Sequence, residues 1–125
     1  AGGGSVLIRG GTLLTVTRGV IKNGSVLVIN GKITAVGPAD RVQAPAGVPV
    51  IEAAGKYVMP GIVDAHSHMA IEGGINEGTY SLTPEVRIAE CVNPRDVTIY
   101  RALAGGVTTA HLMHGSANAI GGQNA

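Results

Sequence analysis

Short apolar segments separated by turn residues fill the first half of the chain, from residue 5 to residue 58. Each segment is rich in Val, Ile or Leu, and Gly, Asn or Pro stands between them: "SVLI", "TLLTV", "SVLVI", "KITAVG", "PVIEA" and "KYVM". Runs of this length and composition predict strands. Asn23-Gly24 and Asn30-Gly31 suit the positive backbone angles of tight hairpins, and "VLVINGKITAVG" is the clearest hairpin. This half therefore predicts a small antiparallel sheet or sandwich.

The pattern changes at Pro60-Gly61. Residues 62–66, "IVDAH", predict an apolar strand that becomes polar at its C-terminal end, and residues 107–113, "VTTAHLM", predict a second strand. A Gly-rich loop and a helix separate them, and such a crossover makes the two strands parallel neighbours in one sheet. Ligand chemistry in these sheets collects beyond the C-terminal ends of the strands. His66-Ser67-His68 and His114-Gly115-Ser116 both follow such ends.

The helix between these strands is predicted within "NPRDVTIYRALAGG". Asn93 can cap it, Pro94 suits its first turn, and Asp96 complements the positive end of the helix dipole. Gly105-Gly106 is expected to end it. The preceding residues 84–92, "PEVRIAECV", are compatible with two further helical turns.

Composition narrows the class of protein. Of the 125 residues, 45% are hydrophobic and 14% are charged, and the formal net charge is +1. This balance argues against disorder and gives no electrostatic reason to expect nucleic acid or an anionic membrane as a partner. No apolar run approaches the length that spans a bilayer. The N-terminal "AGGGSVLIRGG" does not have the pattern of a signal peptide, and Cys91 has no partner for a disulfide, so a cytoplasmic location is favoured.

His66 and His68 are the strongest candidates for chemistry. Residues two apart on a strand point to the same face, so both imidazoles can aim at one point. Two converging neutral imidazoles suit a divalent metal, with zinc favoured and iron, manganese or nickel as alternatives. Asp64 lies on the same face and could reach the site or fix an imidazole tautomer. The alternative is a pair of surface histidines without a ligand.

The remaining polar residues near the strand ends are weaker candidates. His111 and His114 are predicted to face different sides, with His111 in the strand and His114 at the start of a loop that could contact substrate. The other candidates in that loop are Ser116, Asn118 and Gln123, which could bind a ligand or stabilise turns. A further alternative is a simple metal-binding domain that uses all four histidines. No residue in the chain is predicted to be catalytic.

Two blocks of the sequence carry a resemblance to a known family. "GKYVMPGIVDAHSH" and "ALAGGVTTAHLMHGSANAIGGQ" resemble the N-terminal part of amidohydrolase-superfamily enzymes, most closely the imidazolonepropionase-like branch. The resemblance implies a β-sandwich that includes residues 1–59, followed by the first βαβ unit of a TIM (β/α)8 barrel in residues 60–125. It also implies that His66 and His68 bind metal and that Asp64 supports them.

The activity implied by the resemblance is hydrolysis of a C–N bond in a small amide, lactam or related substrate by a metal-activated water. Members of the family complete the site with a carboxylated lysine or glutamate, further histidines and a late aspartate. This chain does not contain those positions, so we expect it to be inactive without the rest of the barrel or a partner chain. The alternative is a non-catalytic module or split-enzyme subunit that packs against a partner chain, and a homo-oligomer is compatible with either reading.

Overall fold

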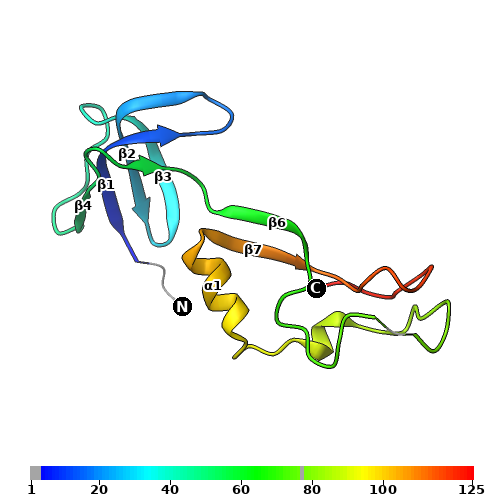
Figure 1. Ribbon diagram of the computed structural model, residues 1–125. Helices are drawn as coiled ribbons and strands as arrows, with labels where there is room; N and C mark the ends of the chain where they lie inside the picture. Colours follow the sequence, from blue (N-terminus) through cyan, green and yellow to red (C-terminus); the bar gives the residue numbers. More distant parts are fainter. Residues whose placement is uncertain (1–3, 77) are drawn as a thin grey trace. The chain divides into compact units, whose positions relative to one another are not determined.

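The computed structural model describes residues 4–76 and 78–125 (Figure 1). The chain divides into two compact units, residues 1–60 and 61–125. Regular structure in the described residues is mostly β-strand, with a single α-helix and a short 3₁₀ helix. No helix in the described ranges is both long and apolar enough to cross a membrane.

The first unit is built on one five-stranded sheet. Its strands are β1 (Val6–Leu14), β2 (Val20–Ile29), β3 (Lys32–Pro38), β4 (Val50–Glu52) and β5 (Tyr57–Val58). The order is β3-β2-β1-β4, and β5 also pairs with β1. The five strands of this unit thus belong to a single hydrogen-bonded sheet.

The prediction of an antiparallel sheet holds for β1, β2 and β3 and is wrong for β4 and β5, which run parallel to β1. The reason is the connection after β3. Residues 39–49 carry the chain to the edge of β1 that β2 leaves free, and the chain then runs in the direction of β1 (Figure 1). The turn predicted near Gly55 is present, with a positive φ of 75° at that residue.

The two Asn-Gly pairs have different roles. Asn30 and Gly31 have φ values of 51° and 76° and join β2 to β3, so the predicted hairpin is confirmed. The hairpin expected at Asn23-Gly24 is wrong, because this pair lies inside β2 at an irregularity in its register with β1. A Cβ on Gly24 would lie 2.6 Å from the side chain of Leu13. Glycine is therefore required there by a close approach in the core, not by a chain reversal.

The core of this unit is small and aliphatic, as expected for a chain without Phe or Trp. Leu7, Leu27 and Val42 are buried against one another, and partly buried residues surround them: Ile29, Ala35, Ala44 and Val48. Leu7 and Leu27 face each other across the β1–β2 pair, and Val42 comes from the connection after β3. The connection therefore contributes to the core as well as reversing the pairing direction.

The second unit contains β6 (Ile62–Ser67), η1 (Ile88–Cys91), α1 (Val97–Ala104) and β7 (Val107–Leu112). Strands β6 and β7 pair in parallel, which confirms the crossover predicted from the sequence. Helix α1 directly precedes β7 and contacts it (Figure 1). Two helical turns over residues 84–92 are not formed, and the 3₁₀ helix η1 takes their place.

Helix α1 begins later than predicted. Its N-cap is Asp96, whose carboxylate accepts a hydrogen bond of 2.7 Å from the Thr98 amide. Asn93 is not the cap, because its side-chain oxygen accepts a 2.9 Å bond from the Arg95 amide and so closes a separate turn. The helix ends at Gly105 and Gly106, as predicted, and Gly106 has a φ of 95°.

Backbone bonds connect the long loops that follow β6 and β7. Leu82 pairs with Ile120 and Arg87 pairs with Gln123 in isolated bridges. Gly122 has a φ of 102°, and a Cβ at this position would lie 2.3 Å from the Val86 carbonyl oxygen. The loop after β7 is thereby held against residues 82–88, which places its side chains beside those of the loop after β6.

Candidate metal and ligand site

His66 and His68 converge at the C-terminal end of β6. Their Nε2 atoms lie 3.3 Å apart, and the ring planes are nearly perpendicular at 88° with centroids 5.0 Å apart. His66 is the penultimate residue of β6, and His68 follows the strand directly. The spacing of two residues therefore brings both rings to one point, as the sequence predicts.

The orientation of His68 is fixed by the neighbouring strand. Its Nδ1 atom lies 2.7 Å from the carbonyl oxygen of Met113, the residue that follows β7. A carbonyl oxygen only accepts hydrogen bonds, so Nδ1 carries the proton and donates. In the neutral ring, Nε2 of His68 then holds a lone pair directed at the point shared with His66.

The spacing of the two nitrogens fits a shared divalent metal ion. Zinc binds histidine nitrogen at about 2.0–2.1 Å with tetrahedral angles, which places two ligand nitrogens roughly 3.3–3.4 Å apart. The Nε2–Nε2 separation of 3.3 Å lies in this range. The separation is therefore compatible with two ligands of one metal ion.

Asp64 supports the pair in a way that differs from the predicted contact with an imidazole. Its Oδ1 atom accepts a 3.2 Å hydrogen bond from the backbone amide of His66. The carboxylate therefore constrains the backbone that carries the first imidazole. A direct bond from Asp64 to either ring does not occur in the described contacts.

His111 lies apart from the His66–His68 pair. Its ring is exposed, and its Nδ1 atom lies 3.2 Å from the carbonyl oxygen of Ala65 on the adjacent strand. Within residues 4–76 and 78–125, no group of three or more His, Cys, Asp or Glu side chains is arranged to hold a metal. The alternative of a four-histidine metal domain therefore finds no support in the part of the chain that is described.

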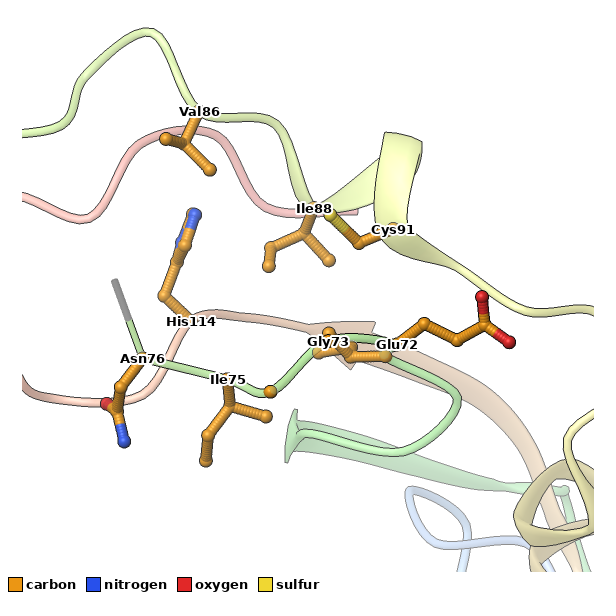
Figure 2. A pocket seen from close by; sticks show the side chains of 10 residues that line it. Glu72, Gly73, Ile75, Asn76, Val86, Ile88, Cys91 and His114 are labelled. Atoms are coloured by element: carbon orange, nitrogen blue, oxygen red, sulfur yellow. The ribbon is translucent and has the colours of Figure 1, made fainter. Parts of the chain in front are cut away.

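His114 lines a cavity of about 270 Å³ formed by the loops after β6 and β7 (Figure 2). Its Nε2 atom is buried and has no hydrogen-bond partner among the described residues. The predicted separation of His111 and His114 is thus present, since one ring is exposed against a strand and the other points into a cavity.

The three remaining candidates mainly hold their loop in place. Asn118 donates a 2.7 Å bond from Nδ2 to the carbonyl of Tyr80, while its buried Oδ1 has no partner in residues 4–76 and 78–125. Gln123 pairs through its backbone with residues 86 and 88. Ser116 is exposed and does not line this cavity. These contacts favour the turn-stabilising interpretation.

Sequence reasoning did not identify the apolar wall of the cavity. The wall consists of Ile71, Ile75, Val86 and Ile88, and Cys91 lies at its edge. These residues come from two loop segments without periodic pattern, so no sequence signal joins them. Met113 was also missed, because it acts through its carbonyl group, which every residue possesses.

The comparisons with known proteins agree on one family. No family model matches the chain. An amidohydrolase, tasK, of Hapsidospora irregularis is 36% identical over 80% of this chain and 11% of its own length. An adenine deaminase of Paracoccus denitrificans is 36% identical over 93% of this chain and 17% of its own length. An imidazolonepropionase of Geobacillus kaustophilus is 45% identical over 44% of this chain and 14% of its own length.

Solved structures give the same result. An amidohydrolase from Thermotoga maritima superposes with a TM-score of 0.85 at 38% identity, covering 95% of this chain and 32% of that one. An L-hydantoinase (dihydropyrimidinase) from Arthrobacter aurescens superposes with a TM-score of 0.52 at 30% identity, over 84% of this chain and 19% of that one. The chain thus spans less than a third of the length of each of these relatives. It belongs to the amidohydrolase superfamily and corresponds to the N-terminal part of its members.

Proposed function

We propose that this chain supplies the first metal ligands of a metal-dependent hydrolase that cleaves C–N bonds in amides, lactams or related small molecules. The observation that carries the proposal is the convergence of the His66 and His68 Nε2 atoms, 3.3 Å apart at the end of a parallel strand. The relatives include amidohydrolases, a deaminase and a hydantoinase, which supports this class of reaction.

In this proposal His66 and His68 hold a divalent metal, with zinc favoured. A metal in such a site lowers the pKa of a bound water and polarises the bond under attack. The residues of this chain orient the ligands: the Met113 carbonyl fixes His68, and the Asp64 carboxylate fixes the backbone of His66. The remaining ligands and the proton-transfer group would come from later strands of a (β/α)8 barrel.

The second unit exposes apolar side chains, which supports the proposal that further protein packs against this unit and completes the site. Val97, Tyr100 and Leu103 on α1 are 53%, 74% and 60% exposed, and Val63 on β6 is 65% exposed. Apolar side chains gathered on one short unit are typical of a surface that packs against more protein. The same surface is compatible with the second candidate, a split subunit that packs against a partner chain.

The test is the metal content and hydrolytic activity of the complete protein that contains this chain. We expect purified protein to hold stoichiometric metal by plasma mass spectrometry and to hydrolyse members of an amide and lactam panel. His66→Ala and His68→Ala should each remove metal and turnover together. His111→Ala is the matched control, because that ring is exposed on β7 and should leave both unchanged.

Full metal content and turnover in both variants of the converging pair would contradict the proposal. The split-subunit candidate predicts a different result: the 125-residue chain alone would acquire metal and activity only when mixed with a separate partner. Light scattering on the mixture, with the chain alone as reference, would detect that complex.

A further inference from the structure

The backbone adopts a strained conformation two residues after His68. Ala70 has a φ of 59°, in the left-handed region that residues other than glycine seldom adopt. Among the non-glycine residues with positive φ in residues 4–76 and 78–125, Ala70 is the buried one, with 3% of its surface exposed. Such a conformation persists only where the surrounding structure holds it. The contacts of Ala70 therefore bear on the neighbouring imidazole.

Two hydrogen bonds hold Ala70 in this conformation. Its amide donates to the hydroxyl oxygen of Thr98 at 3.2 Å, and its carbonyl accepts from the Asn93 amide at 2.8 Å. The bond from Asn93 is made by the backbone, so it does not depend on that side chain. The bond to Thr98 requires a side-chain oxygen. Thr98 is thus the residue whose identity decides whether the Ala70 amide is held.

The hydroxyl of Thr98 is presented from a fixed position. Thr98 is the second residue of α1, and its own amide donates to the capping carboxylate of Asp96 at 2.7 Å. Helix α1 contacts β7, the strand that pairs with β6. Since all of these residues belong to the second unit, the arrangement does not depend on how the two units are placed.

His68 lies between two anchored segments of backbone. Before it, the Ser67 carbonyl accepts a 3.0 Å bond from the Met113 amide, and the Ser67 hydroxyl accepts a 3.4 Å bond from the Met69 amide. After it, Ala70 is held by α1. A functional side chain is placed precisely only when its supporting backbone and neighbours are fixed. The 2.7 Å bond from Nδ1 of His68 to the Met113 carbonyl therefore depends on both anchors.

Loss of the anchor at Ala70 has a specific consequence. Without the acceptor on Thr98, the preference of alanine for negative φ would favour relaxation of Ala70 out of the left-handed region. The peptide between Met69 and Ala70 would then rotate and redirect the chain that leaves His68. The imidazole of His68 would lose its alignment with the Met113 carbonyl.

We propose that Thr98 is a positioning residue for His68. Its hydroxyl holds Ala70 in the left-handed conformation and thereby directs Nε2 of His68 to the point shared with His66. The proposal rests on the proposed function for the metal that His68 would bind, and it extends the support of that ligand to a helix residue 30 positions away in the chain.

The first measurement uses the complete protein that contains this chain, labelled with ¹⁵N-histidine and stripped of metal by a chelator. The ¹⁵N chemical shifts at alkaline pH give, for each ring, the ratio of the Nδ1-protonated to the Nε2-protonated form. His111 is the internal control, because its Nδ1 also bonds a backbone carbonyl, that of Ala65. We expect Thr98→Val to lower this ratio about tenfold at His68, the effect of losing one hydrogen bond, and to leave it unchanged at His111.

Thr98→Ser keeps the hydroxyl and should restore the ratio at His68. Thr98→Ala repeats the test with a smaller side chain, so that a packing defect in Thr98→Val does not decide the result. Ala70→Gly tests the route of the effect. Because glycine adopts positive φ without penalty, Thr98→Val should have a smaller effect in the Ala70→Gly background.

The second measurement is the affinity of the same variants for zinc, by competition with a chromophoric chelator. Thr98→Val should raise the Kd for zinc about tenfold, the lower end of the range for groups that orient metal ligands. Thr98→Ser should bind zinc as the unchanged protein does. The midpoint of urea unfolding, recorded for each variant, separates these effects from a general loss of stability.

Three results would overturn the inference. They are an unchanged ratio at His68 in Thr98→Val and Thr98→Ala, parallel changes at His68 and His111, and an equal loss in Thr98→Ser and Thr98→Val. An undiminished effect of Thr98→Val in the Ala70→Gly background would overturn the route through Ala70. If the unchanged protein bound no zinc, the proposed function would fail, whereas the ratio in metal-free protein would still decide the role of Thr98.

Discussion

The Nδ1 atom of His68 lies 2.7 Å from the carbonyl oxygen of Met113, although 45 residues separate them in the chain. His68 follows β6 and Met113 follows β7, so the bond connects the ends of two parallel strands. Both strands belong to the second unit. The parallel register of β6 and β7 determines the orientation of the His68 imidazole, and the crossover through α1 establishes that register.

Asp64 provides the first prediction. Asp64→Ala removes the acceptor for the His66 amide, so the backbone that carries the first imidazole should lose a constraint. Groups that orient metal ligands typically affect metal affinity about 10–100-fold. We expect a loss within that range, measured by competition with a chromophoric chelator. Asp64→Asn keeps a side-chain oxygen and should stay close to the unchanged protein; a loss equal to that of Asp64→Ala would argue for a role of the charge instead.

Gly61 provides the second prediction, because it allows β7 to approach the start of β6. A Cβ on Gly61 would lie 2.1 Å from Oγ1 and 2.7 Å from Cβ of Thr108. Gly61→Ala should therefore destabilise the second unit by about 1–3 kcal/mol, the usual cost of overpacking. Urea unfolding measures the effect. In the double variant with Thr108→Gly the clash is gone, so the two changes should not add.

The control for this prediction is Gly78→Ala. A Cβ on Gly78 meets no atom within 4 Å, and its φ is not in the left-handed range. Its unfolding midpoint should match that of the unchanged protein. If Gly61→Ala behaved in the same way, the close approach of β7 to Gly61 would be wrong.

Asp96 provides a prediction about pH. The backbone hydrogen bond from Thr98 is the main reason that the pKa of the Asp96 carboxyl lies below its ordinary value of 3.8. Because the pKa is lower in the folded state, the ionised cap stabilises α1 above about pH 4 and loses this effect as the pH falls through the folded-state pKa. Helix content followed by circular dichroism should decrease across that acidic range.

Two substitutions of Asp96 distinguish the effect of its capping hydrogen bond from the effect of its charge. Asp96→Ala should lower the melting temperature of the second unit at neutral pH, because the Thr98 amide loses its acceptor. Asp96→Asn should keep most of the stability at neutral pH and should lose the contribution of this residue to the acid dependence. Equal destabilisation by both at neutral pH would show that the charge, not the hydrogen bond, forms the cap.

Ser25 provides a prediction in the first unit. Its side chain is fully buried, and Oγ has no hydrogen-bond partner in the part of the chain that the structure describes. Ser25→Ala removes an unsatisfied hydroxyl, so we expect the free energy of unfolding to stay equal or to rise by up to about 1 kcal/mol. Thr83 is the comparison, since its buried hydroxyl donates to the Ile120 carbonyl at 3.2 Å. Thr83→Val should cost about 0.5–1.5 kcal/mol, and a similar loss in Ser25→Ala would show that its hydroxyl is satisfied.

Local sequence signals predicted several elements correctly. The Asn30-Gly31 hairpin follows from the positive φ that this dipeptide tolerates, and the end of α1 follows from Gly105-Gly106. The cap of α1 was misplaced by three residues because Asn93 and Asp96 are both good capping residues. The choice between them depends on which backbone amide each side chain meets.

Long-range pairing was beyond these signals. The segments "VIE" and "YV" contain no local signal that β4 and β5 pair with β1 in parallel. The path of residues 39–49 determines this pairing. Asn23-Gly24 shows the same limit. The pair has hairpin chemistry, yet Gly24 serves a close approach to Leu13 across the sheet.

For the candidate site, the sequence by itself determined the meeting of His66 and His68, since the alternation of a strand directs residues two apart to one face. The tertiary structure decided everything that depends on a second segment. The proton on Nδ1 of His68 depends on the Met113 carbonyl, and the surroundings of His114 depend on a cavity built from two distant loops. The physical reason is that side-chain direction is a local property of the backbone, whereas hydrogen-bond partners and cavities require segments that only folding brings together.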